Sequence, residues 1–298
     1  MMQNTGLSPI EYITIQGVQV AIKRDDLNDP LIQGNKLRKL KYNVQHAIKQ
    51  QHTHIVTFGG AFSNHIAATA AAGHRWGIKT VGIIRGAELA ENKTQWSDTL
   101  KQAQQQGMHL IFVSREAYRL KHNSAVFKSL LKTFDAPYVI PEGGSNALGV
   151  TGVAEIMTEL QQQLPSLPTH IICACGTGGT LAGLMHAVAE TQLPIHIWGI
   201  VVHTAATAIA PDIKTLCKQH QSISWQLFDQ YHFGGYAKTN NQLEEFACQF
   251  RQQHRVALDR VYNCKSFYAL YDLIDRGALS NNDRPLIIHT GGTQGGVF

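Results

Sequence analysis

From residue 53 onward, short apolar runs rich in β-branched residues alternate with longer amphipathic stretches. The apolar runs predict buried strands and the amphipathic stretches predict helices. The expected strands are 53–58, 79–85, 109–113, 137–140, 170–174, 195–202, 223–228 and 286–289. The expected helices include 65–76, 95–106, 150–163, 180–190 and 241–254. This alternation is typical of parallel sheets covered by helices on both faces, so the pattern predicts an α/β protein with two doubly wound, mostly parallel-sheet domains.

The segment 141–149 divides the expected strands into two groups, and it is rich in glycine, serine and asparagine. Such a composition favours turns and linkers. A further helix is expected at 35–49, because aliphatic residues from Leu37 to Ile48 fall on one helical face. We expect the N-terminal segment to join the later strands. This predicts a larger domain of residues 1–49 and 150–298, with residues 50–149 inserted as a smaller α/β domain.

Composition excludes several classes of protein. Of the 298 residues, 44% are hydrophobic and 16% are charged, so the chain can build a large core and intrinsic disorder is excluded. The net charge of +5 is too small to indicate nucleic-acid binding. No apolar run approaches the roughly 18 residues of a membrane span, and the first residues lack the layout of a signal peptide. We therefore expect a cytoplasmic protein that binds neither nucleic acid nor membrane.

Cysteine and histidine usage argues against disulfides and metals. The five cysteines are odd in number and form no C-x-x-C pair, so neither a disulfide framework nor a zinc ribbon is indicated. The 15 histidines are scattered and form no H-E-x-x-H motif, so no metal site is expected.

A glycine-rich loop, Cys175-Gly176-Thr177-Gly178-Gly179-Thr180, follows one expected strand and opens a helix. Its backbone N–H groups can turn toward a ligand, and the helix N-terminus adds about half a positive charge, so the loop suits a phosphate. A tight structural turn is the alternative. A Walker loop fails because no Gly-Lys-Ser/Thr follows, and a dinucleotide site lacks the acidic residue expected near His203. A ligand with one terminal phosphate fits better.

A second loop, Gly59-Gly60-Ala61-Phe62-Ser63-Asn64-His65, joins a strand to a helix of small residues. Ordinary helix capping explains one polar residue at this position but not three. Two glycines followed by Ser-Asn-His form a donor-rich cup that could hold a carboxylate or the edge of an aromatic cofactor. A Ser–His nucleophile pair is disfavoured, since no Gly-x-Ser-x-Gly elbow is present.

Lys36 directly follows Gly34-Asn35, in the first turn of the expected helix 35–49. The positive end of the helix dipole disfavours an ammonium group there and favours a nucleophilic amine. A solvated basic helix face is the alternative. A reactive amine, a phosphate loop and the cup at Asn64 together indicate an aldehyde cofactor with a phosphate tail, and pyridoxal 5'-phosphate (PLP) fits that description.

At these residues the sequence resembles fold-type II PLP enzymes, specifically the family of 1-aminocyclopropane-1-carboxylate (ACC) deaminase and D-cysteine desulfhydrase. The matching motifs are collinear and span nearly the whole chain. They are K-R-D-D-L at 23–27, G-N-K-L-R-K-L at 34–40, G-G-A-F-S-N-H at 59–65, P-E-G-G-S-N at 141–146, C-G-T-G-G-T-L-A-G-L at 175–184, V-Y at 261–262 and H-T-G-G at 289–292. The resemblance implies a fold like that of the tryptophan synthase β subunit, and a homodimer.

The resemblance also implies cofactor-binding roles. Lys36 is the residue implied to bind the aldehyde of PLP covalently, and Lys39 the one to approach its phosphate. Asn64 would bond the cofactor's ring oxygen, and Thr290 would face the pyridine nitrogen. The implied phosphate loop consists of Gly176, Thr177, Gly178, Gly179 and Thr180.

Catalytic and substrate-binding roles follow from the same resemblance. Ser63, Asn64 and His65 are implied to bind the carboxylate of a small amino-acid substrate, and Ser63 also to relay a proton. Tyr236 and Tyr262 are implied to be the two active-site tyrosines that flank the ring and the reacting carbon.

The leading expected reaction is that of D-cysteine desulfhydrase, in which D-cysteine yields pyruvate, ammonia and sulfide. A neutral Thr290 makes the ring a weaker electron sink than a carboxylate would, which favours elimination of a good β leaving group. ACC deaminase activity, giving 2-oxobutanoate and ammonia, is the alternative. Outside this class, a nicotinamide-dependent oxidoreductase and a catalytically silent binding protein stay open, although an intact Lys36 and Ser63 disfavour the latter.

Overall fold

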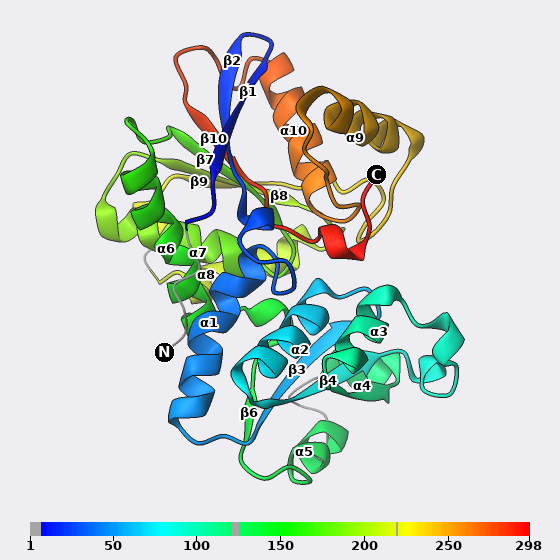
Figure 1. The fold of residues 1–298 in the computed structure, drawn as a ribbon. Coiled ribbons are helices and arrows are strands. Elements are labelled where there is room, and N and C mark those ends of the chain that lie inside the picture. Colours follow the sequence, from blue (N-terminus) through cyan, green and yellow to red (C-terminus); the bar gives the residue numbers. More distant parts are fainter. Residues whose placement is uncertain (1–6, 121–124, 219) are drawn as a thin grey trace.

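Two sheets organise the chain in the computed structural model, which describes residues 7–120, 125–218 and 220–298 (Figure 1). The larger sheet has the spatial order β1-β2-β10-β7-β8-β9, and all neighbours are parallel except β1 and β2. Its strands are β1 (Ile10–Ile15), β2 (Val18–Lys23), β7 (His170–Cys175), β8 (His196–Val201), β9 (Trp225–Phe228) and β10 (Pro285–Ile288). The smaller sheet is parallel throughout, in the order β5-β4-β3-β6. Its strands are β3 (His54–Gly60), β4 (Lys79–Arg85), β5 (His109–Val113) and β6 (Pro137–Val139).

Helices cover both faces of the larger sheet. On one face lie α6 (Ala147–Gln163), α7 (Gly179–Thr191) and α8 (Ala206–Leu216), and on the other lie α9 (Asn241–His254) and α10 (Asn263–Asp275). Successive residues of β7 point to opposite sides, so Ile171 packs with the first group and Ile172 with the second. Burial on both faces explains why these strands are continuous apolar runs.

The smaller sheet is covered in the same way. Helices α1 (Asn35–Lys49), α2 (Asn64–Trp76) and α3 (Asp98–Gln105) pack on one face. The short helices α4 (Arg115–Leu120) and α5 (Ala125–Leu131) pack on the other. Ile55 and Val56 of β3 mark the two faces, because they belong to separate apolar clusters. The fold class predicted from the sequence is confirmed.

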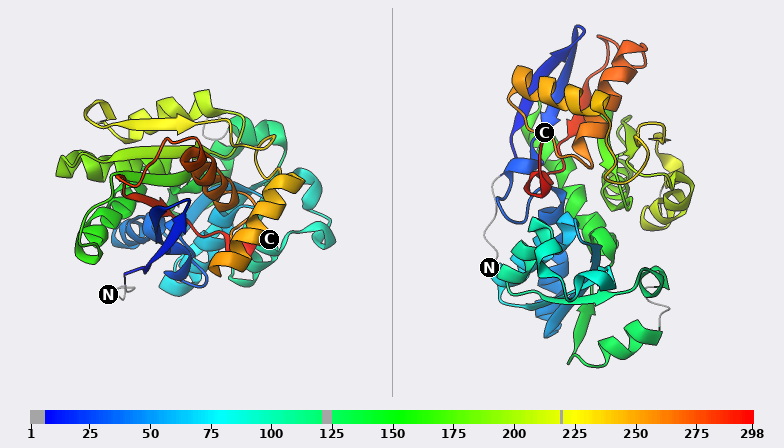
Figure 2. Two further views of the ribbon diagram at one scale, coloured as in Figure 1. Left: turned by 90° about the horizontal axis from the view of Figure 1, so that it is seen from above. Right: turned by 90° about the vertical axis from the view of Figure 1, so that its right-hand side faces the viewer.

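Helix α1 lies between the two sheets (Figure 1), and the right-hand view of Figure 2 shows the two parts of the molecule one above the other. Its apolar face, with Leu40 and Val44, packs against elements of the smaller sheet. Its other side touches α6 so closely that a Cβ at Gly152 would lie 2.0 Å from the Arg38 carbonyl oxygen. The helix thus couples both halves of the molecule. The domain bounds 1–49 with 150–298, and 50–149, stay a prediction.

All eight expected strands are present within a few residues, but the β1–β2 hairpin was not expected. Helices α8 and α10 were also missed. Pro211 lies inside α8, and proline normally argues against a helix interior. Helix α10 begins after Tyr262, which provides no side-chain cap, so the usual start signal is missing.

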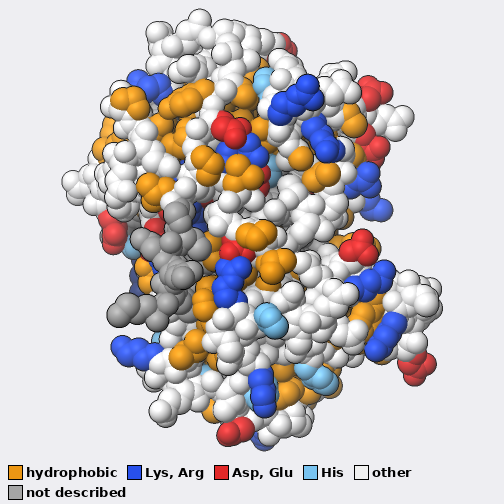
Figure 3. All heavy atoms as spheres, viewed as in Figure 1, with side chains coloured by type: hydrophobic (Ala, Val, Ile, Leu, Met, Phe, Trp, Pro, Cys, Tyr) orange, Lys and Arg blue, Asp and Glu red, His pale blue; other side chains and the backbone are white. Residues whose placement is uncertain are grey.

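Side chains of different kinds are mixed on the face that Figure 3 shows. On the face shown in Figure 3, the coloured lysine and arginine side chains are spread among acidic and hydrophobic ones and form no continuous basic patch. Among the residues that the structure describes, no helix combines the length and the apolar character that crossing a membrane requires.

Candidate active site

A cavity of about 730 Å³ opens where strands of both sheets end. Its wall includes residues that follow the carboxyl ends of β3, β7 and β10, the usual place for ligands in parallel sheets. Twelve residues predicted for the site line it: Lys36, Lys39, Ser63, Asn64, His65, Gly176, Thr177, Gly178, Thr180, Tyr236, Tyr262 and Thr290. Gly179, also predicted, is the first residue of α7, directly behind the wall.

Helix α1 begins tightly against the segment that follows β10. Gly34 is its N-cap, with φ of 68°, and a Cβ there would lie 1.9 Å from the Thr290 carbonyl oxygen. That same oxygen accepts a hydrogen bond from the Asn35 backbone N–H (3.2 Å). Only glycine, which has no Cβ, can adopt this φ and also lie this close to the Thr290 carbonyl oxygen. The contact fixes the position of Lys36, whose Nζ donates to Asn35 Oδ1 at 2.7 Å.

Two lysine side chains in this cavity lack an acidic partner. No salt bridge joins Lys36 or Lys39 to any carboxylate in the part of the chain that the structure describes. Burial lowers the pKa of Lys36 from 10.5 to about 8, although the charge of Asp259 opposes the shift. Burial, and then the charge of Lys36, lower the pKa of Lys39 well below its usual value. The cavity therefore favours a neutral nucleophilic amine and would gain stability from an anion.

The pKa of Lys36 leads to a testable pH dependence. Reductive labelling of Lys36 in the cofactor-free protein by an aldehyde and cyanoborohydride should rise with a midpoint near pH 8, because the neutral amine forms above its pKa. Peptide mass spectrometry across pH 6–11 measures the labelled fraction. A midpoint near that of an ordinary lysine, about 10.4, would contradict the assigned environment.

The glycine-rich loop leaves main-chain donors facing the cavity. Gly178 has φ of 79°, and a Cβ there would lie 2.4 Å from Ile213 Cγ1. Helix α7 starts without a side-chain cap, so its first N–H groups have no partner within the helix. Thr180 Oγ1 accepts from Asn35 Nδ2 at 2.8 Å, which leaves the Thr180 hydroxyl hydrogen free to donate. These donors suit a phosphate group.

Lys39 approaches the same loop from α1. A Cβ at Gly179 would lie 3.0 Å from Lys39 Nζ, and Nζ donates to the Gly143 carbonyl oxygen at 3.2 Å. The amine thus lies at the positive end of α7, where an anion would be bound by both the helix and the lysine.

The start of α2 forms a second anion-binding position. Ser63 is its N-cap, and Ser63 Oγ accepts from the Ile66 N–H at 3.4 Å. The backbone N–H groups of Asn64 and His65 belong to the first turn and have no partner within the helix. A carboxylate can bind there through main-chain donors and the serine hydroxyl.

The His65 ring donates a hydrogen bond from Nε2 and presents an acceptor at Nδ1. Thr57 Oγ1 donates to the Ile140 carbonyl oxygen (2.8 Å), so it must accept from His65 Nε2 (2.8 Å). His65 Nδ1 then carries a lone pair, and it has no partner among the described residues. Burial, reinforced by the charges of Lys36 and Lys39, holds the pKa of His65 well below its usual value. Its neutral ring cannot donate to a carboxylate from Nδ1.

Two tyrosines that line the cavity contact each other. The Tyr262 hydroxyl donates to the Tyr236 hydroxyl at 3.2 Å, and the ring planes meet edge to face at 74°. A Cβ at Gly176 would lie 3.1 Å from Tyr262 Cε1, so the ring rests on the glycine-rich loop. Burial raises the pKa of Tyr262 well above its usual value, which keeps the hydroxyl protonated.

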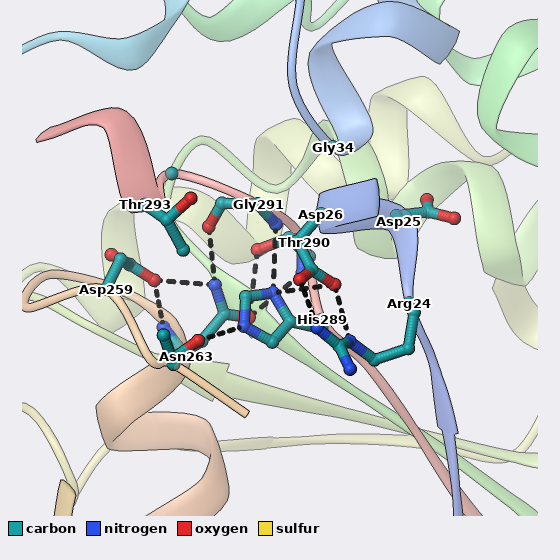
Figure 4. Close-up of polar contacts among 12 residues, drawn as sticks. Arg24, Asp25, Asp26, Gly34, Asp259, Asn263, His289, Thr290, Gly291 and Thr293 are labelled. Carbon is teal, nitrogen blue, oxygen red and sulfur yellow. Dashed lines mark hydrogen bonds and ion pairs between the residues drawn. The ribbon is translucent and has the colours of Figure 1, made fainter. Parts of the chain in front are cut away.

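Asn263 sets the orientation of Thr290 (Figure 4). The Asn263 amide donates to Asp259 Oδ1 (2.6 Å) and to the Gly291 carbonyl oxygen (2.7 Å). Its Oδ1 then accepts from Thr290 N (2.9 Å) and Thr290 Oγ1 (3.3 Å). Because the Thr290 hydroxyl hydrogen points to Asn263, the Thr290 oxygen presents lone pairs to the cavity.

Sequence reasoning missed several residues of the cavity wall. Asn35, Arg85, Glu142 and His203 also line it. Asn35 and Glu142 lie within motifs already singled out, G-N-K and P-E-G-G-S-N, so their positions offered a signal. Arg85 ends an ordinary apolar strand, and nothing in its local pattern marks it.

A family model described as "Pyridoxal-phosphate dependent enzyme" matches residues 2–291. The chain belongs to the pyridoxal-phosphate dependent enzyme family. A D-cysteine desulfhydrase of Salmonella schwarzengrund is 30% identical over 308 residues, covering 96% of this chain and 91% of that protein. A mitochondrial bifunctional D-cysteine desulfhydrase/1-aminocyclopropane-1-carboxylate deaminase of Arabidopsis thaliana is 30% identical over 299 residues, covering 94% and 73% respectively. A crystal structure described as an ACC deaminase homologue has a TM-score of 0.85 and 29% identity, covering 97% of this chain and 90% of that one.

Membership of this family confirms three sequence predictions: the protein is an enzyme, its cofactor is PLP, and its fold is that of the ACC deaminase-like enzymes. The nicotinamide-dependent alternative is set aside. Within the described part of the chain, no cluster of three or more histidine, cysteine, aspartate or glutamate side chains could hold a metal ion.

The cavity fits PLP on structural grounds. Asn64 lines the cavity, and its side-chain amide supplies the kind of hydrogen-bond donor that an ionised ring oxygen requires. The start of α7 offers unpaired N–H groups for a phosphate, and Lys36 offers an amine of lowered pKa for the aldehyde. A nucleophile, a phosphate cradle and an amide side chain therefore share one wall.

Proposed function

We propose that the protein is a PLP-dependent lyase that eliminates sulfide from D-cysteine and, with the consumption of one water molecule, gives pyruvate, ammonia and hydrogen sulfide. One observation carries the proposal: the amine of Lys36, the anion-binding starts of α2 and α7, and the Tyr236–Tyr262 pair line a single cavity. The names of the Salmonella and Arabidopsis relatives support the choice of substrate.

In this proposal Lys36 binds PLP covalently and the loop 176–180 binds its phosphate. A bound phosphate would favour the protonated form of Lys39, which lies beside the same loop, and the Asn64 amide would donate to the cofactor's ring oxygen. Thr290 turns its hydroxyl hydrogen to Asn263, so its oxygen would accept a hydrogen bond from the pyridine nitrogen only when that nitrogen is protonated. When bound, PLP supplies an electron-withdrawing ring that stabilises negative charge at the substrate α-carbon.

Substrate binding uses the start of α2. The substrate carboxylate accepts hydrogen bonds from the Ser63 hydroxyl and from the backbone N–H groups of Asn64 and His65. The contribution of His65 to this anion is its main chain, because its ring presents an acceptor nitrogen. With the carboxylate held there, a small amino acid lies between Lys36 and the two tyrosines.

Proton movement is assigned to three groups. The amine of Lys36, whose neutral form is made more available because burial lowers its pKa to about 8, accepts the α-proton, and Ser63 relays protons beside it. The Tyr262 hydroxyl, which burial keeps protonated, donates to Tyr236, so the Tyr236 hydroxyl hydrogen is free to assist the departing thiolate.

Thr290 favours elimination over ring opening. Thr290 carries no charge, so it stabilises a protonated pyridine nitrogen less than a carboxylate would. A reaction that needs a long-lived carbanion at the substrate is therefore disfavoured. A thiolate is a good leaving group and needs less stabilisation. ACC ring opening to 2-oxobutanoate is the second candidate, supported by the name of the Arabidopsis relative.

A substrate panel tests the proposed reaction. The holoenzyme is assayed for keto-acid formation with D-cysteine, L-cysteine, D-serine and ACC, and sulfide is measured in parallel. D-cysteine should show a kcat/KM at least about 10-fold above each of the others. Formation of 2-oxobutanoate from ACC as the dominant activity would replace the main candidate by the second one.

The role of Thr180 in phosphate binding gives a further prediction. Thr180→Val removes one hydroxyl donor, so the affinity for PLP should fall by about 10- to 100-fold, as for one hydrogen bond to a charged group. Thr151→Val is the matched control, because the Thr151 hydroxyl is exposed on α6 and bonds only to the Ala147 carbonyl oxygen. Equilibrium titration with PLP measures both affinities, and equal values would contradict the role of Thr180.

We propose further that the protein is a cytoplasmic homodimer. The five free cysteines, of which Cys248 alone is exposed, suit a reducing compartment. The dimer is inferred from the family resemblance. Light scattering on a sizing column tests it, and a monomeric mass at micromolar concentration would contradict it.

A further inference from the structure

Lys265 is a fully buried lysine whose ammonium group is bound only by main-chain oxygens. It lies on α10, the orange helix in Figure 1, three residues after Tyr262. Its Nζ donates to the carbonyl oxygens of Val202 (3.2 Å), His232 (2.8 Å) and Gly235 (2.7 Å). An ammonium has three hydrogens, so all of them are used. No carboxylate of the described residues forms a salt bridge with it.

The three acceptors belong to segments that build the cavity wall. Val202 directly precedes His203, which lines the cavity and contacts the Gly176 carbonyl oxygen through Nε2 at 3.0 Å. His232 and Gly235 lie in the loop that ends at Tyr236. Lys265 therefore connects the loop of one active-site tyrosine to the helix that begins at the other.

The loop 232–237 around Tyr236 adopts an unusual backbone conformation, which is unfavourable at its two non-glycine positions with positive φ, Phe233 and Ala237. Phe233, Gly234, Gly235 and Ala237 have positive φ values of 51°, 87°, 129° and 56°. Such angles are unfavourable for residues other than glycine and persist only where surrounding contacts impose them. The loop belongs to no sheet, and its backbone hydrogen bonds from Gly235 N–H to the His232 carbonyl oxygen (3.0 Å) and from Lys238 N–H to the Gly235 carbonyl oxygen (3.2 Å) are turns within the loop. Contacts from other elements are therefore needed to fix its position. Charge-assisted bonds from Lys265 to its two carbonyls are stronger than neutral ones.

We propose that Lys265 is a positioning residue that holds the loop 232–237 so that the Tyr236 hydroxyl stays against that of Tyr262. The effect on catalysis rests on the proposed function, because it requires Tyr236 to act in the reaction. The effect on the position of the loop is independent of the proposed function, because it follows from the three carbonyl contacts of Lys265 alone.

The loop is tested first, by hydrogen exchange of Lys265→Met in the full-length protein. Methionine keeps the length of the side chain and removes its donors, so amides of residues 232–238 should exchange at least about 10-fold faster than in the wild type. Lys23→Met is the matched control. Lys23 is equally buried, but its Nζ contacts Ser8, Gln163 and Glu159, away from the loop. Unchanged exchange at 232–238 in Lys265→Met would overturn the proposal.

The link to catalysis is tested by a double-mutant cycle on the PLP-loaded enzyme. Lys265→Met should lower kcat/KM for D-cysteine by about 100-fold, the scale of a misplaced catalytic group. In the Tyr236→Phe background the same change should cost less than about 3-fold, because the positioned hydroxyl is already absent. Equal costs in both backgrounds would overturn the positioning of Tyr236.

Two controls keep the results separable. If Lys265→Met does not fold, Lys265→Gln replaces it, because glutamine retains two hydrogen-bond donors. In this variant the amides of the loop 232–237 should exchange faster than in the wild type but less than about 10-fold faster. Exchange at the wild-type rate would count against the proposal. If the wild type turns over no D-cysteine, the proposed function fails, and the exchange result still decides whether Lys265 holds the loop.

Discussion

Replacing Lys36 with alanine is expected to lower turnover by a factor of about 10⁴ or more, as for the loss of a covalent catalytic group. The amine is the nucleophile for the aldehyde of PLP and the base for the α-proton, so two functions disappear together. The fold should persist. Because burial lowers the pKa of Lys36 to about 8, its charged form opposes folding below that pH, and its removal should not lower the melting temperature of the cofactor-free protein.

Lys41→Ala is the matched control for this prediction. Lys41 lies on the same helix, but its Nζ pairs with Glu155 at 2.8 Å and does not line the cavity. Keto-acid formation by Lys41→Ala should stay within about 3-fold of the wild type, since partly exposed ion pairs contribute little. Substantial turnover by Lys36→Ala in the same assay would remove Lys36 from the centre of the mechanism.

Replacing Gly34 with alanine is expected to destabilise the protein by at least about 3 kcal/mol, a large effect for a single methyl group. The new Cβ would lie 1.9 Å from the Thr290 carbonyl oxygen, with further contacts to the backbone of Gly291 at 2.8 Å. Backbone atoms cannot rotate away as a side chain can, so α1 must separate from the segment after β10. This movement carries Lys36 away from Thr290, and PLP affinity should fall together with stability.

Gly77→Ala separates the steric effect from the backbone conformation. Gly77 has φ of 70°, close to the 68° of Gly34, but a Cβ there meets nothing within 4 Å. Replacing Gly77 with alanine should lower the free energy of unfolding by only about 1 kcal/mol, because only the left-handed backbone conformation is then unfavourable. Urea unfolding of both variants measures the difference. Equal losses of stability would show that the contact with Thr290 has no special importance.

The periodicity of the chain predicted the sheets well because the central strands are buried on both faces. Such strands are uniformly apolar, and β7 and β8 stand out in the sequence for that reason. The β1–β2 hairpin has an exposed edge and a mixed pattern, so it carried a weaker signal. Helix α10 begins without a side-chain cap at Tyr262. Asp259 instead accepts from the N–H group of Asn263, the first residue of the helix, and from those of Val261 and Tyr262 just before it.

Most of the cavity wall was predictable because its residues cluster in short motifs at strand–helix junctions. Ser63 and Asn64, for example, stand together after β3. The chemical state of the side chains was not predictable. The acceptor nitrogen of His65 depends on Thr57 and Ile140, and the orientation of the Thr290 hydroxyl depends on Asn263. These contacts join segments far apart in sequence, so no local pattern reports them.

The contacts of the C-terminal segment were also not predictable from local sequence patterns. Its sequence gave no indication of a role, yet Gly292 and Thr293 donate to Gln33 Oε1 at 2.9 Å, directly before the N-cap of α1. A Cβ at Gly295 would lie 3.0 Å from Asn64 Oδ1. The tail therefore packs behind the residues that start α1 and α2, where it helps to fix both.

Reduction of the PLP-loaded enzyme with borohydride, followed by peptide mass spectrometry, tests the central claim most directly. The reagent converts the link between the cofactor and its lysine into a stable bond, so the modified residue can be identified. The account predicts a phosphopyridoxyl group on Lys36, with Lys39 and Lys265 unmodified. A label on either of those lysines, or no labelled lysine at all, would contradict it.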